Sequence, residues 1–165
     1  MREVRKLTFH TKDRRFGLVL SKERLSELLT FCRQAGPRET GGLLIGRYSA
    51  HRDLAVVSHV TGPARDSMAG RTWFHRGVAG LQDLLFQRWR QQEYYLGEWH
   101  SHPGAEPVPS GIDADQMRSI ACSPGYHCPE PILLIVGGNL WGEWTLRARV
   151  YRRGEEPQDM TEESK

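Results

Sequence analysis

Hydrophobic residues in the segment that follows Ser21 recur with the spacing of an α-helix. Four of them fall at positions i, i+3, i+4 and i+7: Leu25, Leu28, Leu29 and Cys32. These positions share one face of a helix, which we therefore expect to be buried. Ser21 is of a residue type that caps helix N-termini, and Gly36-Pro37 ends the helical pattern.

Shorter hydrophobic runs along the chain favour β-strands. The first of these is an extended start over about residues 4–20. Residues 41–48 and 54–60 are two apolar runs separated by the polar stretch His51-Arg52-Asp53, and this arrangement predicts a hairpin. Residues 94–102 predict a further strand. The segment ILLIV at 132–136 is apolar throughout, as in a strand that is buried in the core.

The remaining pattern completes an alternation of strands and helices. Apolar and polar side chains alternate over residues 144–150, which predicts a strand with one buried face. A helix is expected from about Gly77 to Gln92, and its apolar side is made of Val78, Leu81, Leu84, Leu85 and Trp89. Another begins at Ser110, after a proline-rich loop at 103–109. We therefore expect an α/β fold in which helices flank a central mixed sheet.

Chain length and charge define the domain organisation. A chain of 165 residues fits one domain. Residues 154–165 are rich in Glu, Pro, Gln and Ser, which predicts a disordered acidic tail after a folded domain of residues 1–153. That domain has 22 basic and 15 acidic side chains, a net charge of +7. It contains no long run of Lys or Arg, so the charge pattern does not favour nucleic-acid binding.

The sequence also predicts a cellular location. The start, MREVRKLTFH, lacks the apolar segment of a secretion signal, and no apolar stretch approaches the ~20 residues of a membrane helix. We therefore expect a protein of the reducing cytoplasm with no membrane partner and with three free, buried cysteines: Cys32, Cys122 and Cys128. Cys122 and Cys128 beside His127 also allow a second metal site, although they lack zinc-finger spacing.

Candidate metal ligands come at the end of the strand expected over residues 94–102. Side chains two apart in a strand point to one face, so His100 and His102 project together, about 6.6–6.8 Å apart along the strand. Asp113 lies one turn into the helix that begins at Ser110, where its carboxylate can turn back toward the imidazoles. Two His and one carboxylate leave the fourth position of a tetrahedral zinc open for water, as catalytic sites require.

Each of these residues also has an interpretation without a metal. Ser110 to Asp113 matches a helix capping box, and a single buried His is usually a hydrogen-bonded core residue. Capping and metal binding are compatible, because Ser110 can begin the helix that directs Asp113. Asp115 is an alternative ligand, but a step of two residues turns it by about 200° around the helix.

Together these motifs resemble the JAMM signature of the JAB/MPN zinc metalloproteases. The matching residues are Glu39-Thr-Gly-Gly-Leu-Leu-Ile-Gly46, His100-Ser-His102-Pro103, and the pair Ser110 and Asp113. The order of elements is similar over about residues 20–150. The resemblance implies one zinc held by His100, His102 and Asp113, with Glu39 as general base and Ser110 stabilising the tetrahedral intermediate. It also implies a cytidine-deaminase-like α/β sandwich.

Glu98 competes with Glu39 for the role of general base. Glu98 lies on the same strand face as His100, close to the expected metal in sequence. A residue two positions before a ligand is held in place by the strand, which favours a supporting role for Glu98. Glu39 precedes a different strand, and the resemblance assigns the proton transfer to it.

The resemblance extends to short bacterial peptidases encoded beside ubiquitin-activating-like and ubiquitin-conjugating-like enzymes in antiphage systems, including CBASS. It implies hydrolysis of the peptide or isopeptide bond after the C-terminal glycine of a ubiquitin-like modifier, for maturation or for removal from a target. It also implies those two enzymes as partners. Two alternatives stay open: processing of a ubiquitin-like sulfur-carrier protein, and a non-catalytic zinc-containing module that binds nucleic acid.

Overall fold

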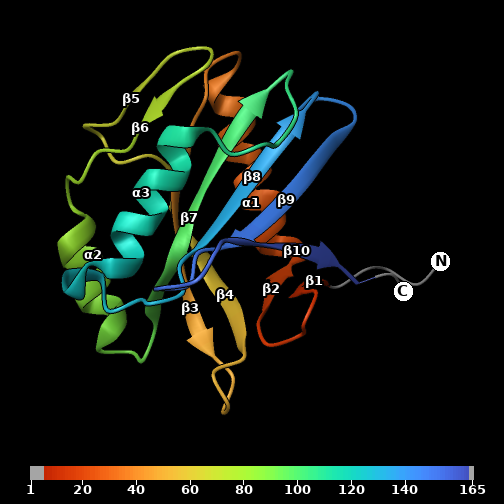
Figure 1. Ribbon diagram of the computed structural model, residues 1–165. Helices are drawn as coiled ribbons and strands as arrows, with labels where there is room; N and C mark the ends of the chain where they lie inside the picture. Colours follow the sequence, from red (N-terminus) through yellow and green to blue (C-terminus); the bar gives the residue numbers. More distant parts are fainter. Residues whose placement is uncertain (1–5, 164–165) are drawn as a thin grey trace.

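The computed structural model describes residues 6–163 as a mixed β-sheet with helices on both faces (Figure 1). The strands of this sheet are β1 (Lys6–Thr11), β2 (Gly17–Ser21), β3 (Gly41–Tyr48), β4 (Leu54–Val60), β7 (Tyr94–Pro103), β8 (Ile132–Gly138), β9 (Trp144–Val150) and β10 (Gln158–Glu162). A separate small hairpin is formed by β5 (Met68–Ala69) and β6 (Phe74–His75). The helices are α1 (Lys22–Ala35), α2 (Leu81–Trp89) and α3 (Gly111–Cys122), with a 3-10 turn, η1, at Pro124–Tyr126.

The order of strands places β7 in the interior of the sheet. Neighbouring strands follow the order β1-β10-β9-β8-β7-β3-β4-β2, and β2 also pairs with β1. The pairs β7 with β8 and β2 with β4 are parallel, whereas the others are antiparallel. The prediction of a central mixed sheet is therefore confirmed.

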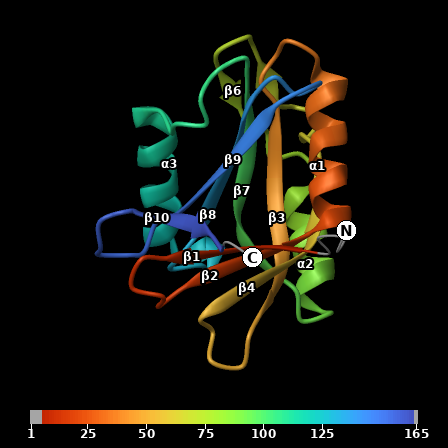
Figure 2. The ribbon, with the colours of Figure 1, turned by 90° about the vertical axis from the view of Figure 1, so that its right-hand side faces the viewer.

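Helices α1 and α3 lie on opposite faces of the sheet (Figure 2). One hydrophobic cluster joins the buried face of α1 to residues such as Leu44 and Leu134. A second cluster joins Met117 of α3 and the apolar side of α2 to Ile45 and Ile135. Leu134 and Ile135 are neighbours in β8 and both are fully buried, so this strand is covered on both faces, as its apolar sequence predicted.

Several elements begin and end where the sequence predicted. Ser21 caps α1 by accepting a hydrogen bond from the Arg24 N–H, and Gly36, with φ 62°, ends this helix. The predicted hairpin corresponds to β3 and β4. Ser110 caps α3, and its Oγ accepts a hydrogen bond from the Asp113 N–H.

Two segments differ in part from the prediction. The helix expected from Gly77 is shorter: Val78 lies before α2 and is 67% exposed. The carboxylate of Asp66 accepts hydrogen bonds from the N–H groups of Val78 and Ala79, and Gly80 adopts φ 76°, so this stretch forms a turn. The extended start is confirmed for the two strands β1 and β2, but the tight turn between them, which folds them into a hairpin, was not predicted.

The predicted disordered tail is wrong for most of its length. Strand β10 pairs with β1 on one side and with β9 on the other. Met160 is 5% exposed and lies in the same hydrophobic cluster as α1, while Asp159 binds Arg149 at 2.8 Å. A few apolar and charged contacts thus order a segment whose composition is polar. Residues 164–165 of the predicted tail lie outside the described residues.

The cysteine prediction is confirmed in part. All three cysteines are free, and Cys32 and Cys128 are buried, but Cys122 at the end of α3 is exposed. Within residues 6–163, none of the helices has the length and apolar character needed to cross a bilayer.

The packing of β10 predicts that replacing Met160 with Ala destabilises the protein. We expect the free energy of unfolding to fall by about 2–5 kcal/mol, because the substitution leaves a cavity in the core. Chemical denaturation measures this change, and Glu162→Ala, at an exposed position of the same strand, is the control. Equal stability of the two variants would contradict the burial of β10.

Candidate metal centre

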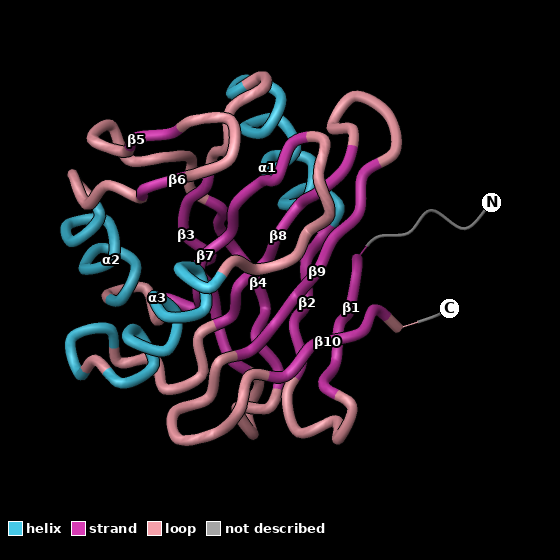
Figure 3. The backbone as a smooth tube through the Cα atoms, turned by 45° about the horizontal axis from the view of Figure 1, so that its top comes forward, coloured by secondary structure: helices cyan, strands magenta, loops and turns pink. Residues whose placement is uncertain are grey.

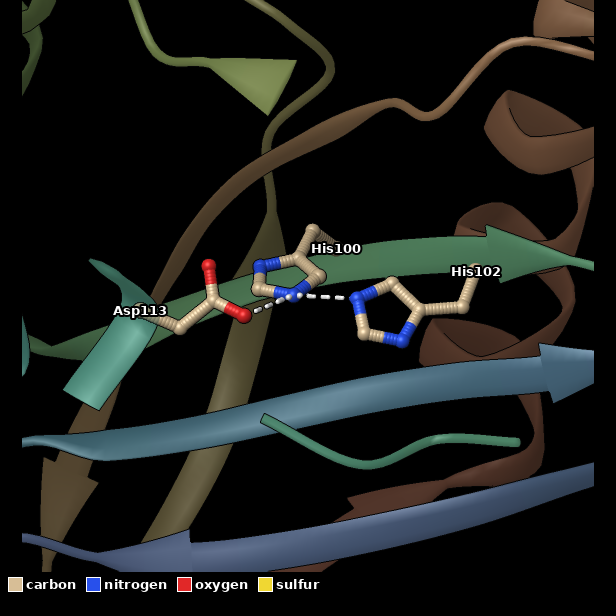
Figure 4. A group of neighbouring side chains, drawn as sticks. All are labelled: His100, His102 and Asp113. Atoms are coloured by element: carbon tan, nitrogen blue, oxygen red, sulfur yellow. Dashed lines mark hydrogen bonds and ion pairs between the residues drawn. The ribbon is translucent and has the colours of Figure 1, made fainter. Parts of the chain in front are cut away.

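Strand β7 brings two imidazoles together on the face of the sheet that α3 covers. His100 and His102 project from this strand, and their Nε2 atoms lie 3.1 Å apart (Figure 4). Both side chains are largely buried, with exposed fractions of 10% and 13%. The alternation predicted from the sequence therefore places them as expected.

Helix α3 contributes the third group through its first turn. Ser110 and Asp113 form a capping box, in which the Ser110 N–H donates to Asp113 Oδ2 at 2.7 Å. The same Oδ2 atom lies 3.5 Å from His100 Nε2, and Figure 4 shows the carboxylate turned toward the imidazole. The capping interpretation of Ser110 to Asp113 is confirmed, and the capping box also holds the carboxylate toward the histidines, as the metal-binding interpretation requires.

The three groups fit the geometry of a tetrahedral metal site. One donor atom from each of His100, His102 and Asp113 lies within 4.8 Å of the others. Ligand atoms at the corners of a tetrahedron, each about 2.0–2.1 Å from zinc, are about 3.3 Å apart. In residues 6–163, this is the one group with such convergence, so Cys122, Cys128 and His127 do not form a second site.

The loop after β7 determines which nitrogen of His102 is available. His102 Nδ1 lies 3.1 Å from the carbonyl oxygen of Glu106. A carbonyl oxygen only accepts hydrogen bonds, so Nδ1 carries the proton and Nε2 keeps its lone pair for a metal. The loop is itself anchored to β8, because Gly104 N–H donates to Gly138 O at 2.9 Å and Gly138 N–H donates to Ala105 O at 2.8 Å.

Electrostatics favour the metal-binding protonation states. Burial alone would raise the pKa of Asp113, but hydrogen bonds from His100 and Ser110 outweigh it and lower the pKa to about 2. Burial lowers the pKa of His102, which therefore stays neutral more readily. A neutral imidazole and an ionised carboxylate are the forms that bind a metal.

Glu39 reaches the centre from the residues that precede β3. Its Oε1 atom lies 4.0 Å from His102 Nε2, and its side chain is 11% exposed. The Glu39 N–H donates to the carbonyl oxygen of Gly70 at 2.8 Å. Burial raises the pKa of the Glu39 carboxyl group, which makes this carboxylate a stronger base.

The two competing acidic residues are engaged elsewhere. Glu98 is buried and its Oε1 atom accepts hydrogen bonds from Arg76 at 2.9 Å and Tyr95 at 3.2 Å. The side chain of Asp115 is 83% exposed and pairs with Arg118. Of the acidic candidates, Glu39 and Asp113 are the two that the structure brings together with the histidines.

Sequence reasoning missed the contributions of Glu106 and Gly70. Both residues contribute backbone carbonyl oxygens, one to His102 and one to the Glu39 N–H. A carbonyl oxygen is present in every residue, so no side-chain type marks these positions. The proline-rich composition of 103–109 indicated only that this segment is irregular.

Comparison with known proteins adds a family and several relatives. The family described as prokaryotic homologs of the JAB domain matches residues 21–149. A "CD-NTase/cGAS isopeptidase" from Enterobacter hormaechei is 43% identical over 93% of this chain and 86% of its own length. A protein of the same name from Escherichia coli is 38% identical over 62% of this chain and 65% of its own length.

More distant proteins agree with this result. "Probable metalloprotease y4qB" from Sinorhizobium fredii is 28% identical over 71% of this chain and 78% of its own length. A protein from Desulfitobacterium hafniense, solved in solution, has a TM-score of 0.61 and 22% identity over 89% of this chain and 88% of its own length. At that identity the solved structure supports the fold alone.

The geometry predicts that Asp113→Ala abolishes metal binding, whereas Asp115→Ala does not. Asp113 is part of the converging group, and Asp115 points into solvent on the same helix. Elemental analysis of the purified variants measures the metal content per chain. Equal metal content in the two variants would mean that the carboxylate ligand is wrongly assigned.

Proposed function

The chain belongs to the prokaryotic JAB-domain family, as its motifs predicted, and on this basis we propose that it is a zinc-dependent isopeptidase. The family and the names of the relatives support a hydrolase that uses a metal. The convergence of His100, His102 and Asp113 is the observation that carries the proposal. The choice of zinc rests on this donor set, because two imidazoles and a carboxylate are typical zinc ligands.

The residues around the centre support a hydrolytic mechanism. Zinc held by His100, His102 and Asp113 would supply a Lewis acid and lower the pKa of a coordinated water to about 7. The Glu39 carboxylate would then take the proton of the attacking water and pass it to the nitrogen of the leaving amine. The raised pKa of Glu39 suits both proton transfers. A carboxylate with a higher pKa takes the proton from water more readily, and it then keeps this proton until the leaving amine accepts it.

Ser110 would stabilise the charge that develops on the carbonyl oxygen of the substrate. Its Oγ atom accepts a hydrogen bond from the Asp113 N–H at 3.1 Å, which leaves its own hydroxyl hydrogen available as a donor. A donor aimed at a developing oxyanion lowers the energy of the transition state more than that of the ground state. The capping box would keep this hydroxyl in place.

The substrate we propose is a conjugate joined through the C-terminal tail of one protein. The sequence resemblance favours a ubiquitin-like modifier cleaved after its last glycine. The name of the relatives, CD-NTase/cGAS isopeptidase, favours a CD-NTase as one member of the conjugate. We therefore propose an isopeptide bond between such a C-terminal tail and a target amine. A role in antiphage defence, action in the cytoplasm and cooperation with activating-like and conjugating-like enzymes follow from the same proposal.

The position of Glu39 favours an enzyme over a binding module. A structural zinc site requires ligands, but it has no use for a further carboxylate at 4.0 Å from a ligand atom. Processing of a sulfur-carrier protein would use the same hydrolytic chemistry on a different C-terminal tail. This alternative therefore differs from the proposed function in its substrate and not in its mechanism.

Incubation with defined fusions tests this function. The zinc-loaded protein is mixed with a ubiquitin-like protein and, separately, with a CD-NTase, each extended at its C-terminus by a short peptide. We expect intact-mass measurement to show cleavage at the native C-terminus of one of them, with loss of cleavage after treatment with a chelator. The sulfur-carrier alternative is tested with a third fusion. Intact fusions in all three reactions would contradict the proposed function.

The general-base assignment predicts that Glu39→Gln separates catalysis from metal binding. Gln keeps the size of the side chain but loses the basic carboxylate, so turnover of the cleaved fusion should fall ~10²–10⁴-fold. Elemental analysis should still find one zinc per chain, because Glu39 is not among the proposed ligands. Turnover at the normal rate would exclude Glu39 as the base.

A further inference from the structure

Glu98, the alternative to Glu39 as general base, forms a buried ion pair with Arg76 close to the proposed metal centre. Arg76 Nε donates to Glu98 Oε1 at 2.9 Å, and the two side chains are 8% and 9% exposed. Glu98 lies two residues before His100 in β7 and therefore shares its face of the sheet. Separating the two buried side chains would leave each of them as a buried, unpaired charge, which is unfavourable. The ion pair between Arg76 and Glu98 is therefore expected to stay formed.

Arg76 connects β7 to two other segments. It directly follows β6, and its second guanidinium nitrogen donates to the Tyr126 hydroxyl of η1 at 2.9 Å. Its remaining nitrogen donates to the Gly77 carbonyl oxygen at 3.1 Å. The whole fork of the guanidinium group is thus used, and it fixes the end of the β5–β6 hairpin against the sheet.

The base of this hairpin is closed by side-chain hydrogen bonds. The Asp66 carboxylate accepts hydrogen bonds from the Val78 N–H at 3.1 Å and the Ala79 N–H at 2.9 Å. Ser67 Oγ accepts another from the Gly77 N–H at 2.9 Å. We call residues 66–79 the hairpin segment. These hydrogen bonds join the two ends of the segment into one structural unit.

The tip of the hairpin segment contacts the proposed general base. The carbonyl oxygen of Gly70 accepts a hydrogen bond from the Glu39 N–H at 2.8 Å. The Phe74 ring packs so closely on Gly41 that a Cβ atom built there would lie 2.7 Å from it. Figure 3 shows this hairpin above α2, at the edge of the sheet where β3 begins. The backbone on both sides of Thr40 is therefore held by the hairpin segment.

We propose that Arg76 and Glu98 are positioning residues, which anchor the hairpin segment and through the Gly70 carbonyl hold Glu39 at the metal centre. The part of the proposal that concerns turnover rests on the proposed isopeptidase function, whereas the anchoring does not. A displacement of about 1 Å of a catalytic group can cost ~10²-fold in rate. The pair thus acts on catalysis without touching the substrate.

The double variant Arg76→Met with Glu98→Gln tests the anchor. It removes both charges together, so neither partner is left as an unpaired buried charge. The control is Arg88→Met with Glu93→Gln, an ion pair of 3.5 Å just before the start of β7, in which Glu93 is 8% and Arg88 28% exposed. Hydrogen exchange is measured at the Glu39 amide and over the hairpin segment, together with zinc affinity by chelator competition.

We expect the Glu39 amide to exchange at least ~10-fold faster in the Arg76/Glu98 double variant, because its bond to Gly70 opens more often. Zinc affinity should stay within about threefold, since the ligands are intact. On a cleavable fusion, kcat should fall ~10–100-fold while KM changes little. The Arg88/Glu93 control should show none of these changes.

Unchanged protection of the Glu39 amide in the Arg76/Glu98 variant would overturn the anchoring proposal. An equal effect in the control pair would also overturn it, because the change would then reflect general destabilisation. If the wild-type protein cleaves none of the fusions, the isopeptidase proposal fails, while the exchange measurement still decides whether the pair anchors the hairpin segment. Faster exchange with unchanged kcat would reject the positioning role in catalysis.

Discussion

Strand β7 is hydrogen-bonded along both edges, and the arrangement of the metal centre depends on this double pairing. Its neighbours β3 and β8 fix its register, with His100 opposite Gly41 on one side and Ile135 on the other. Trp99 and Ser101 consequently point to the α1 face, where Ser101 Oγ accepts a hydrogen bond from the Thr40 N–H at 3.1 Å. A slip of one residue would bury both imidazoles against α1, so the fold holds the proposed ligands by the same contacts that form its core.

The polar groups around the proposed metal centre form hydrogen bonds that hold them in orientations suited to a metal. The capping box supplies an N–H to the Asp113 carboxylate, and the Glu106 carbonyl oxygen orients the His102 ring. These contacts are made by loop and helix-end backbone, which the sheet holds in place. Little rearrangement is then needed when an ion binds, and preorganised ligands of this kind bind with a smaller entropic cost.

Periodicity in the sequence was sufficient to predict the elements that carry the proposed ligands. The strand over 94–102 and the helix capped at Ser110 are local patterns, and both are present in the structure, where His100, His102 and Asp113 converge. The β5–β6 hairpin was missed because its strands have only two residues each, and β10 was missed because it is short and polar and one of its partners, β1, is distant in the sequence. Likewise, helix α2 begins only at Leu81 because the Asp66 carboxylate binds the backbone just before it. Asp66 lies well before the segment whose hydrophobic spacing predicted the helix.

Strand β10 has a consequence for the way the chain folds. It pairs Phe9 with Glu162, so this contact joins residues near opposite ends of the described chain. Contacts of such sequence separation form slowly, because a long loop must close before they are gained. During synthesis, β1 and β9 therefore each keep one edge unpaired until β10 has been made. Unpaired strand edges promote aggregation, so the sheet is more open to aggregation before β10 pairs than after it.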